Sequence, residues 1–470
     1  MKKYIAAVLL FLVVASGTSR AQAFKTGFFL DNYQYGYRIN PASMPSKSSL
    51  GIALTNISVA PSSSIGFGDI LYPGTGNSLV TGFNSSVSTD EFLGNLLPSS
   101  CLSADVSENI LSVVIRKNRS FGNFEINVRA IADAAVPYDL FAMLKTGTSE
   151  KAYDLSGLAA GAKAYIEIAY GKAYMIGDNL SVGARIKGLL GMANVTFDAG
   201  NTTANLQQGI IGADVNAKIM MSSKYLSCST VDGGDVLDPS SLKFNSAFYG
   251  PTGYGAALDL GAVWKPVKGL EVSAAVQDLG AVRWDYNLVA TSSASASFSG
   301  AGEMDITSSE GANAIADELQ AQLDKLSSLA DFHVQSGSHA GWEMLPFSAN
   351  AGAKYSFARN ILSVGALATL RRSQYLTSYD IRGGLTLSPV KWLSLAGTAG
   401  TGTFGPTMGA GLSVNLLTFN FHAGIDGYMG KTGSYALDKP VAGISSVPFP
   451  VGKFDCRLNL GLTLTFGERH

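Results

Sequence analysis

The chain has 470 residues, of which 15% are charged and 53 are glycine. Soluble domains carry about 25% charged residues and about 7% glycine, so this chain has too few charges for an ordinary soluble surface. Its net charge is -1, and it contains no cluster of lysine and arginine residues. Because a nucleic-acid-binding surface needs a basic patch, the composition excludes nucleic acid as a partner.

The N-terminus has the pattern of an export signal. Lys2 and Lys3 precede an apolar run at 5–14, and Ala21-Gln22-Ala23 follows as a small-x-small cleavage pattern. We predict a signal peptide at residues 1–23 that is cleaved after Ala23. The alternative is a retained anchor helix, which the run disfavours because it is shorter than the roughly 20 apolar residues that span a bilayer. No later run is long enough, so the exported chain is either a soluble β-protein or an outer-membrane barrel.

The next segment, residues 24–48, is rich in aromatic residues but shows neither helical nor strand periodicity. Such a segment needs a surrounding wall to become ordered, and we predict that it plugs the inside of a barrel. We expect Arg38 to pair with a carboxylate. The alternative is an ordinary periplasmic extension. The predicted plug site consists of Asp31, Arg38, Asn40 and Pro41.

Strand-like runs recur from residue 49 to the C-terminus, and there are fifteen of them. Bacterial barrels normally have an even number of strands, with short periplasmic turns alternating with long outer loops. Short and long connections alternate here except around 199–250, and the alternation is restored if 203–222 belongs to an outer loop. We therefore predict an all-β, transmembrane antiparallel β-barrel of fourteen strands at 49–470, with extracellular insertions at 199–250 and 290–345. A sixteen-stranded barrel is the alternative, if 225–250 hides another strand.

Many of these strands have one apolar and one polar face, as strand side chains alternate with period 2. In the hairpin at 164–195, which turns at Gly177-Asp178-Asn179, Ile186 falls on the apolar face and Arg185 on the polar face. The last strand alternates most strictly. It ends in Phe466, which is typical of the signal that barrel-insertion machinery recognises, so we expect that machinery as a partner. Trp264 and Trp392 adjoin predicted periplasmic turns, as interfacial aromatic residues do.

The polar faces carry charges of both signs. In a barrel lumen such charges can neutralise one another and the plug, because an unpaired charge is costly in a low-dielectric site. A wall of mutually paired charges is favoured over a selectivity ring, which would need one sign concentrated at one level. The predicted lumen-facing residues are Glu125, Arg129, Glu167, Arg185, Lys187, Asp259, Glu271, Arg382 and Arg457.

Two segments have helical character. Residues 137–145 predict a short helix, and 310–330 place apolar residues at helical spacing within a stretch of seven acidic residues and one lysine between 303 and 331. The second helix is either a lid or partner-binding loop, or a solvated helix packed on the barrel rim, and the rim helix is the favoured alternative.

No enzymatic chemistry emerges from the motifs, and no catalytic, metal or cofactor site is predicted. The glycine-rich stretch 400–405 is followed by Pro406 where a dinucleotide-binding motif needs a helix. The four histidines show no metal-ligand spacing. His422 shares its inward face with Asn420, but no nucleophile motif accompanies it. The three cysteines, Cys101, Cys228 and Cys456, permit at most one disulfide, and Cys456 is expected on the lipid side.

Three stretches carry a family resemblance: Asn40-Pro41-Ala42, the segment 257–285 and the closing RLNLGLTLTFG. They resemble outer-membrane barrels of Bacteroidetes related to the FadL long-chain fatty-acid transporters and to PorV. The resemblance implies a plugged fourteen-stranded barrel in the outer membrane, in contact with outer-membrane lipid. It implies either a FadL-like barrel that binds or passes a hydrophobic small molecule, or a PorV-like scaffold that binds a surface protein partner through its outer loops.

Overall fold

The structure is a computed structural model of the chain. It describes residues 24–467 except 32, 46–48, 75–78, 148–150, 208–209, 246–249, 299–330, 358–359, 417, 430–431, 442–443 and 451. The signal peptide and the helix at 310–330 lie outside the described residues and remain predictions.

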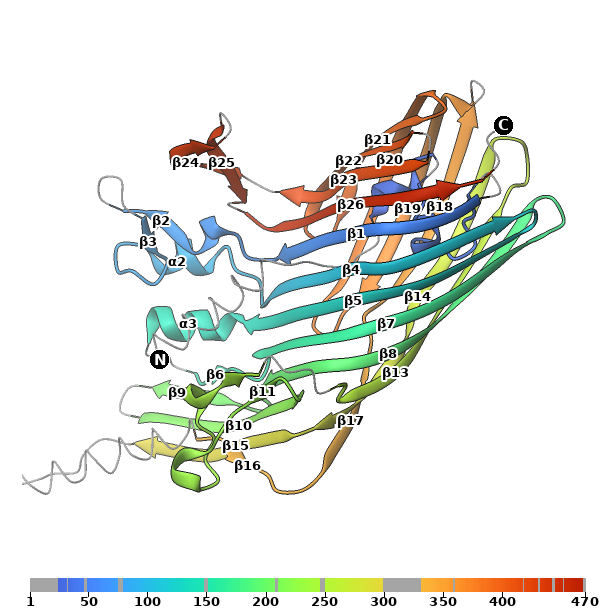
Figure 1. The fold of residues 1–470 in the computed structure, drawn as a ribbon. Coiled ribbons are helices and arrows are strands. Elements are labelled where there is room, and N and C mark those ends of the chain that lie inside the picture. The colour runs from blue at the N-terminus through green and yellow to red at the C-terminus, as the bar shows by residue number, and fades with distance from the viewer. Residues whose placement is uncertain are drawn as a thin grey trace, which may run out of the picture.

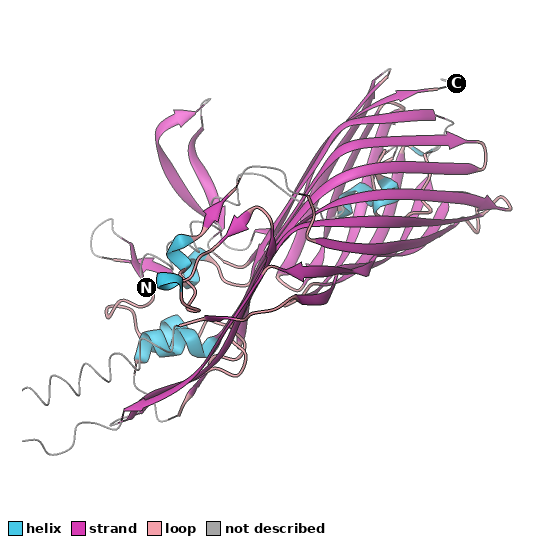
Figure 2. Cartoon of the chain, turned by 60° about the horizontal axis from the view of Figure 1, so that its bottom comes forward, coloured by secondary structure: helices cyan, strands magenta, loops and turns pink. Residues whose placement is uncertain are grey.

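Fourteen antiparallel strands form a closed ring (Figures 1 and 2). The ring closes because β1 pairs with β4 on one side, where Ile57 faces Glu108, and with β26 on the other, where Ile57 faces Leu460. The predicted count of fourteen is confirmed. In order around the ring the strands are β1 (Ser49–Ser63), β4 (Ser99–Lys117), β5 (Ser120–Pro137), β7 (Ala159–Ile176), β8 (Leu180–Asp198), β13 (Gly253–Trp264), β14 (Leu270–Tyr286), β18 (Phe347–Phe357), β19 (Leu362–Arg372), β20 (Thr377–Val390), β21 (Leu393–Gly402), β22 (Gly405–Leu416), β23 (Phe419–Met429) and β26 (Phe454–Phe466).

Six short connections lie at one end of the ring, which we name the turn end. The β7–β8 connection is only Gly177-Asp178-Asn179, and Gly177 has a φ of 62°, a left-handed conformation that glycine adopts without steric cost. The start of β1 and the end of β26 lie at the same end, since Leu50 pairs with both Ile115 and Phe466. The opposite end carries the long connections, but it also has two short ones, Thr403-Phe404 between β21 and β22 and 373–376 between β19 and β20.

One wall of the barrel continues beyond the ring at the opposite, long-loop end (Figure 2). There β10 (Ile210–Ser223) pairs with the end of β8, with β9 (Thr203–Gln207) and with β15 (Leu288–Phe298), while β17 (His339–Met344) pairs with the end of β14. Residues 203–222 thus contribute β9 and β10 and no strand of the closed ring. Strand β15 was not predicted, because its Ser and Ala residues carry no apolar alternation.

A small folded module also lies at the long-loop end. Its elements include η4 (Phe67–Asp69), β2 (Leu71–Pro73), β3 (Leu79–Thr81), α2 (Thr89–Leu93), α3 (Tyr138–Thr146) and β6 (Tyr153–Asp154). Phe92 is fully buried among Tyr72, Phe141 and Tyr153. The helix predicted at 137–145 is therefore present as α3. The remaining elements of this end are β11 (Leu226–Ser227), η5 (Val231–Gly233), η6 (Pro239–Ser241), β12 (Lys243–Phe244), β16 (His333–Val334), β24 (Thr432–Val441) and β25 (Ile444–Pro450).

The two faces of the ring have opposite chemistry. Large apolar side chains point outward and are exposed, whereas charged and amide side chains point inward and are buried. An apolar outer face and a polar lumen are typical of outer-membrane barrels. Within the described part of the chain, no helix is both long and apolar enough to cross a membrane. Exposed apolar residues on the ring include Leu50, Ile115, Ile186, Leu385, Leu395 and Leu460.

An arginine in place of Ile186 tests the outer face. Ile186 lies six residues from the β7–β8 turn and is 61% exposed, so it faces the hydrocarbon near mid-strand. We expect I186R to lower the free energy of unfolding by about 2–4 kcal/mol, the cost of arginine near the bilayer midplane. The measurement is urea unfolding in lipid vesicles, with I186V as the control. Equal stability of the arginine variant would show that Ile186 does not face lipid.

Candidate functional site

The lumen contains the N-terminal segment, residues 24–45, which includes η2 (Lys25–Phe28) and η3 (Gly36–Arg38) (Figure 1). Its hydrogen bonds reach strands on all sides of the ring. The Thr26 N–H donates to Asp426 Oδ2 of β23 over 3.1 Å, and the Tyr37 hydroxyl donates to Glu125 Oε1 of β5 over 2.6 Å. The Thr386 hydroxyl of β20 donates to the Phe29 carbonyl over 2.7 Å. The segment thus crosses the inside of the barrel.

Glycines on the barrel wall make room for the aromatic residues of this segment. Phe29 is fully buried against Gly384, and a Cβ atom at that glycine would lie 2.5 Å from Phe29 Cδ1. Phe28 lies against Gly352 in the same way, at 2.7 Å. Part of the high glycine content therefore belongs to the wall of the lumen, where side chains would exclude the segment.

Asn40 anchors the end of the segment to two neighbouring strands. Its amide nitrogen donates to the carbonyls of Ala262 on β13 and Ala274 on β14, at 3.0 and 3.2 Å. Its amide oxygen accepts from the N–H of Ala42 at 2.9 Å. A side chain at Gly261 would collide with Asn40. Within the Asn-Pro-Ala motif, Asn40 thus links the segment to the wall through its amide nitrogen, while its amide oxygen fixes the local turn.

The variant N40D tests this anchor. Aspartate has nearly the same shape but no amide donor, so both strand carbonyls would face a carboxylate. We expect the free energy of unfolding to fall by about 1–3 kcal/mol, the cost of leaving buried polar groups unsatisfied. Urea unfolding is the measurement, and N179D in the exposed β7–β8 turn is the control. Equal effects of the two variants would contradict an anchoring role.

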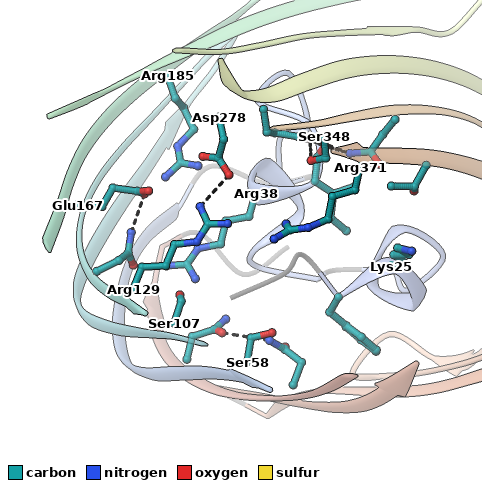
Figure 3. A pocket seen from close by; sticks show the side chains of 18 of the residues that line it. Lys25, Arg38, Ser58, Ser107, Arg129, Glu167, Arg185, Asp278, Ser348 and Arg371 are labelled. Atoms are coloured by element: carbon teal, nitrogen blue, oxygen red, sulfur yellow. Dashed lines mark hydrogen bonds and ion pairs between the residues drawn. The ribbon is translucent and has the colours of Figure 1, made fainter. Parts of the chain in front are cut away.

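A network of ion pairs joins the segment to β5, β8 and β14 (Figure 3). Arg38 Nη2 lies 2.7 Å from Glu125 Oε1, and Arg185 contacts the other oxygen of the same carboxylate. Arg185 and Lys187 both contact Asp259, at 3.1 and 2.9 Å. Further links connect Lys187 to Glu167 and Asp278, Arg129 to Asp278 and Asp105, and Arg371 to Asp105.

A second group of charges surrounds the other end of the segment. Lys25 lies 3.5 Å from Asp380, which also binds Arg382. Arg382 contacts Asp426 as well. The pKa of Lys25 is lowered to about 7, chiefly by burial and also by Arg457, while Asp380 opposes the shift. Burial therefore favours the neutral form of this lysine more than an exposed position would.

Arg38 remains a cation. Burial alone would lower the pKa of its guanidinium, but the carboxylate of Glu125 and the neighbouring tyrosines raise it above the ordinary value. Arg38 also lies over the ring of Tyr35, 5.0 Å from its centre. Arg38 thus makes a buried, charge-assisted contact between the segment and the wall.

The structure distributes the predicted site residues over three places. Glu125, Arg129, Glu167, Arg185, Lys187 and Asp259 form the network of Arg38, and Arg382 and Arg457 lie near Lys25. Glu271 instead lies at the turn end, 28% exposed and paired with Lys265 at 3.2 Å. Arg185 and Lys187 were expected to be available to carboxylates such as Glu167 or Asp31. Lys187 lies 3.9 Å from Glu167, whereas Asp31 pairs with Lys354 on β18 at 3.1 Å.

Several acidic residues of the site were not identified from the sequence. Asp105 lies on β4, whose strand begins at Ser99 rather than at the predicted 110. Asp278 lies where the pairing of β14 with β13 shifts, and its φ of 61° breaks the alternation, which counted from the inward Glu271 would have pointed Asp278 outward. Asp380 and Asp426 share the inward parity of Arg382 and His422, and that parity could have identified them.

Two cavities adjoin the segment. The first, of about 100 Å³, lies among the ion pairs and is lined mainly by charged and amide side chains (Figure 3). The second, of about 1230 Å³, opens at the turn end. Its lining combines apolar residues such as Phe28, Leu30 and Trp392 with lysines such as Lys268 and Lys391.

The remaining candidate groups have structural contacts. His422 lies 2.8 Å from Asn459 and packs edge-on against Tyr33 and Tyr35 of the segment. Within the described residues none of the three cysteines forms a disulfide, and Cys456 is partly buried. Across the described residues, no three His, Cys, Asp or Glu side chains are grouped to hold a metal ion.

A closed ring with an apolar exterior and a polar, segment-filled lumen defines an outer-membrane type of β-barrel. The chain belongs to a family of unknown function, DUF5723, whose model matches residues 41–426. No curated protein matches the chain.

Among solved structures the chain is similar to other barrels at low sequence identity. The CymD monoaromatic hydrocarbon channel is 10% identical with a TM-score of 0.42, covering 93% of each chain. The P. putida toluene transporter TodX is 10% identical with a TM-score of 0.40, covering 92% of this chain and 93% of its own. A Pseudomonas aeruginosa FadL homologue is 11% identical with a TM-score of 0.40, covering 96% and 95%.

Proposed function

We propose that this protein is a gated outer-membrane transport barrel, closed in its resting state by residues 24–45. The observation that carries the proposal is the position of this segment, which crosses the lumen and bonds to strands on all sides of the ring. The cavity beside it measures only about 100 Å³. An ion or small solute therefore needs the segment to move before it can pass. The proposal includes export by a signal peptide cleaved after Ala23, so the purified protein should begin at Phe24.

Conductance in planar bilayers tests the gate. The full mature chain should show no steady current, and deletion of residues 24–45 should produce stepwise conductance. Heat-modifiable gel mobility of both proteins verifies that the barrel is folded. Steady conductance of the full chain, or an unchanged current after the deletion in a folded barrel, would refute a plug.

For the cargo we propose a hydrophobic small molecule that binds in the cavity at the turn end. Its volume of about 1230 Å³ exceeds the usual range of about 300–1,000 Å³ for ligand pockets, so a small ligand fits. The apolar side chains of Phe28, Leu30 and Ile39 are available there. The central lumen is less suitable, because its buried charges would face an apolar molecule without hydrogen bonds.

Uptake of an apolar fluorescent dye, N-phenyl-1-naphthylamine, tests this cargo. Cells that produce the protein should take up the dye faster than cells that do not. The variant F28D, which places a carboxylate in the turn-end cavity, should return uptake to the background rate. K391M, which alters the same cavity without adding a charge to its apolar part, is the control. Equal uptake with and without the protein would exclude this cargo.

A second function, a scaffold that binds a surface partner, is favoured by one observation. The module around Phe92 has its own hydrophobic core at the long-loop end and does not contribute to closing the barrel. If it binds a partner, F92D should abolish stoichiometric co-purification after crosslinking in cells, while the barrel keeps its heat-modifiable mobility. Co-purification that survives F92D, or that never occurs, would refute this function.

A further inference from the structure

The charge balance of the lumen depends on the N-terminal segment. The described network contains five carboxylates, Glu125, Glu167, Asp105, Asp259 and Asp278, and five cations, Arg38, Arg129, Arg185, Lys187 and Arg371. Nine of these ten residues lie on the wall. Only Arg38 belongs to the segment, so its withdrawal leaves five carboxylates facing four cations.

From this balance we propose that Arg38 is an internal counter-ion, and that the barrel becomes a passage preferring small cations over anions when the segment withdraws. The inference rests on the gated barrel proposed above and names the solute class that its open lumen favours. Arg38 then has two roles: it holds the segment in place, and it occupies the position that a permeating cation takes in the open state.

The surroundings of Glu125 contain oxygen atoms that could bind a cation after the segment withdraws. Glu125 is fully buried and receives the Tyr37 hydroxyl and the Arg38 guanidinium, both from the segment. Arg38 also donates to the amide oxygen of Asn127 at 2.8 Å. When the segment leaves, a carboxylate oxygen and a neighbouring amide oxygen become accessible together. Oxygen ligands of this kind suit hard cations.

The size of the preference can be bounded. A carboxylate that has lost a cationic partner in a water-excluding site attracts another cation, because an uncompensated buried charge is costly. Even at the dielectric constant of water, one unit negative charge about 4 Å away enriches a cation about fivefold over a neutral solute and depletes an anion by the same factor, a cation-over-anion ratio of about thirtyfold. The other charges of this network remain paired with one another, and Lys354, which loses Asp31 when the segment withdraws, lies at the turn-end cavity rather than in the network.

The site around Lys25 is a weaker candidate for cation binding than the site around Arg38 and Glu125. Lys25 lies beside Asp380, close to Asp426 and Arg382, and its release would likewise expose a carboxylate. However, Asp380 retains contacts from Arg382 to both of its oxygens, at 2.7 and 2.6 Å, whereas Glu125 retains Arg185 on only one oxygen and loses Arg38 from the other. The proposal therefore depends on Arg38 and Glu125.

Reversal potentials in planar bilayers under a KCl gradient test the proposal in the full mature chain. We expect R38Q to open more often than the wild type, with a potassium-over-chloride permeability ratio of about thirtyfold in each open event. The double variant R38Q/E125Q should open as well but lose the preference. R119Q is the matched control, because Arg119 lies at an exposed turn and pairs with Asp178. Heat-modifiable mobility verifies folding of all four proteins.

The outcomes separate this inference from the proposed function. Open events of R38Q that prefer chloride, or neither ion, would overturn it while leaving the gate intact. A folded R38Q that opens no more often than R119Q would also overturn it, because Arg38 would then not hold the segment. Steady conductance of the wild type would instead refute the gated barrel itself.

Discussion

Replacement of Glu125 by alanine is expected to lower the free energy of unfolding by about 3–5 kcal/mol, the cost of removing one partner from a buried ion pair. Glu125 is fully buried and binds Arg38 and Arg185 together, so the variant leaves two guanidinium groups without their shared carboxylate. Asp259 still compensates Arg185, but Arg38 loses the carboxylate with which it pairs on the wall. The segment should therefore loosen along with the loss of stability.

Urea unfolding in lipid vesicles measures the stability, and limited proteolysis of residues 24–45 measures the loosening. E271A is the matched control, since Glu271 is also an inward acid but pairs only with the half-exposed Lys265. Exposed ion pairs contribute about 0–1 kcal/mol, so the control should change little. Similar losses for the two variants would mean that burial of the Glu125 pair has no special importance.

Introduction of leucine at Gly384 is expected to displace Phe29 and to open the barrel. The position allows no Cβ atom, because Phe29 lies within 2.5–2.7 Å of where it would be. Overpacking of a buried site costs about 1–3 kcal/mol. We expect the segment to move, rather than the strand, because its displacement removes the clash at a lower free-energy cost. We expect stepwise conductance in G384L, together with faster proteolysis of the segment.

The neighbouring glycine provides an unusually close control. Gly383 lies on the same strand but points outward, and a Cβ atom there would meet nothing nearer than 3.8 Å. G383L should therefore leave both conductance and proteolysis at the wild-type level. If both variants open the barrel, a general disturbance of β20 is responsible. If neither does, Phe29 does not hold the segment in the lumen.

Much of the barrel follows from local pattern. Period-2 alternation places Ile186 outside and Arg185 inside without any tertiary information, since successive strand side chains point to opposite faces. The alternation of short and long connections determined the fourteen strands and the excursion at 203–222. Predictions from alternation fail in two places. One is Asp278, where the backbone is irregular, and the other is strand β15, whose Ser and Ala residues do not distinguish an apolar face from a polar one.

Local pattern does not predict which of the charged side chains pair with one another. The sequence by itself determined that the lumen carries both signs and that an aromatic segment precedes the barrel. Only the tertiary structure decided that Asp31 meets Lys354 while Arg38 meets Glu125, 87 residues further along the chain. Strand register, tilt and the path of an aperiodic segment set such distances, and no local periodicity encodes them. The dependence of the lumen's charge balance on one arginine therefore emerges only when the ring is closed around it.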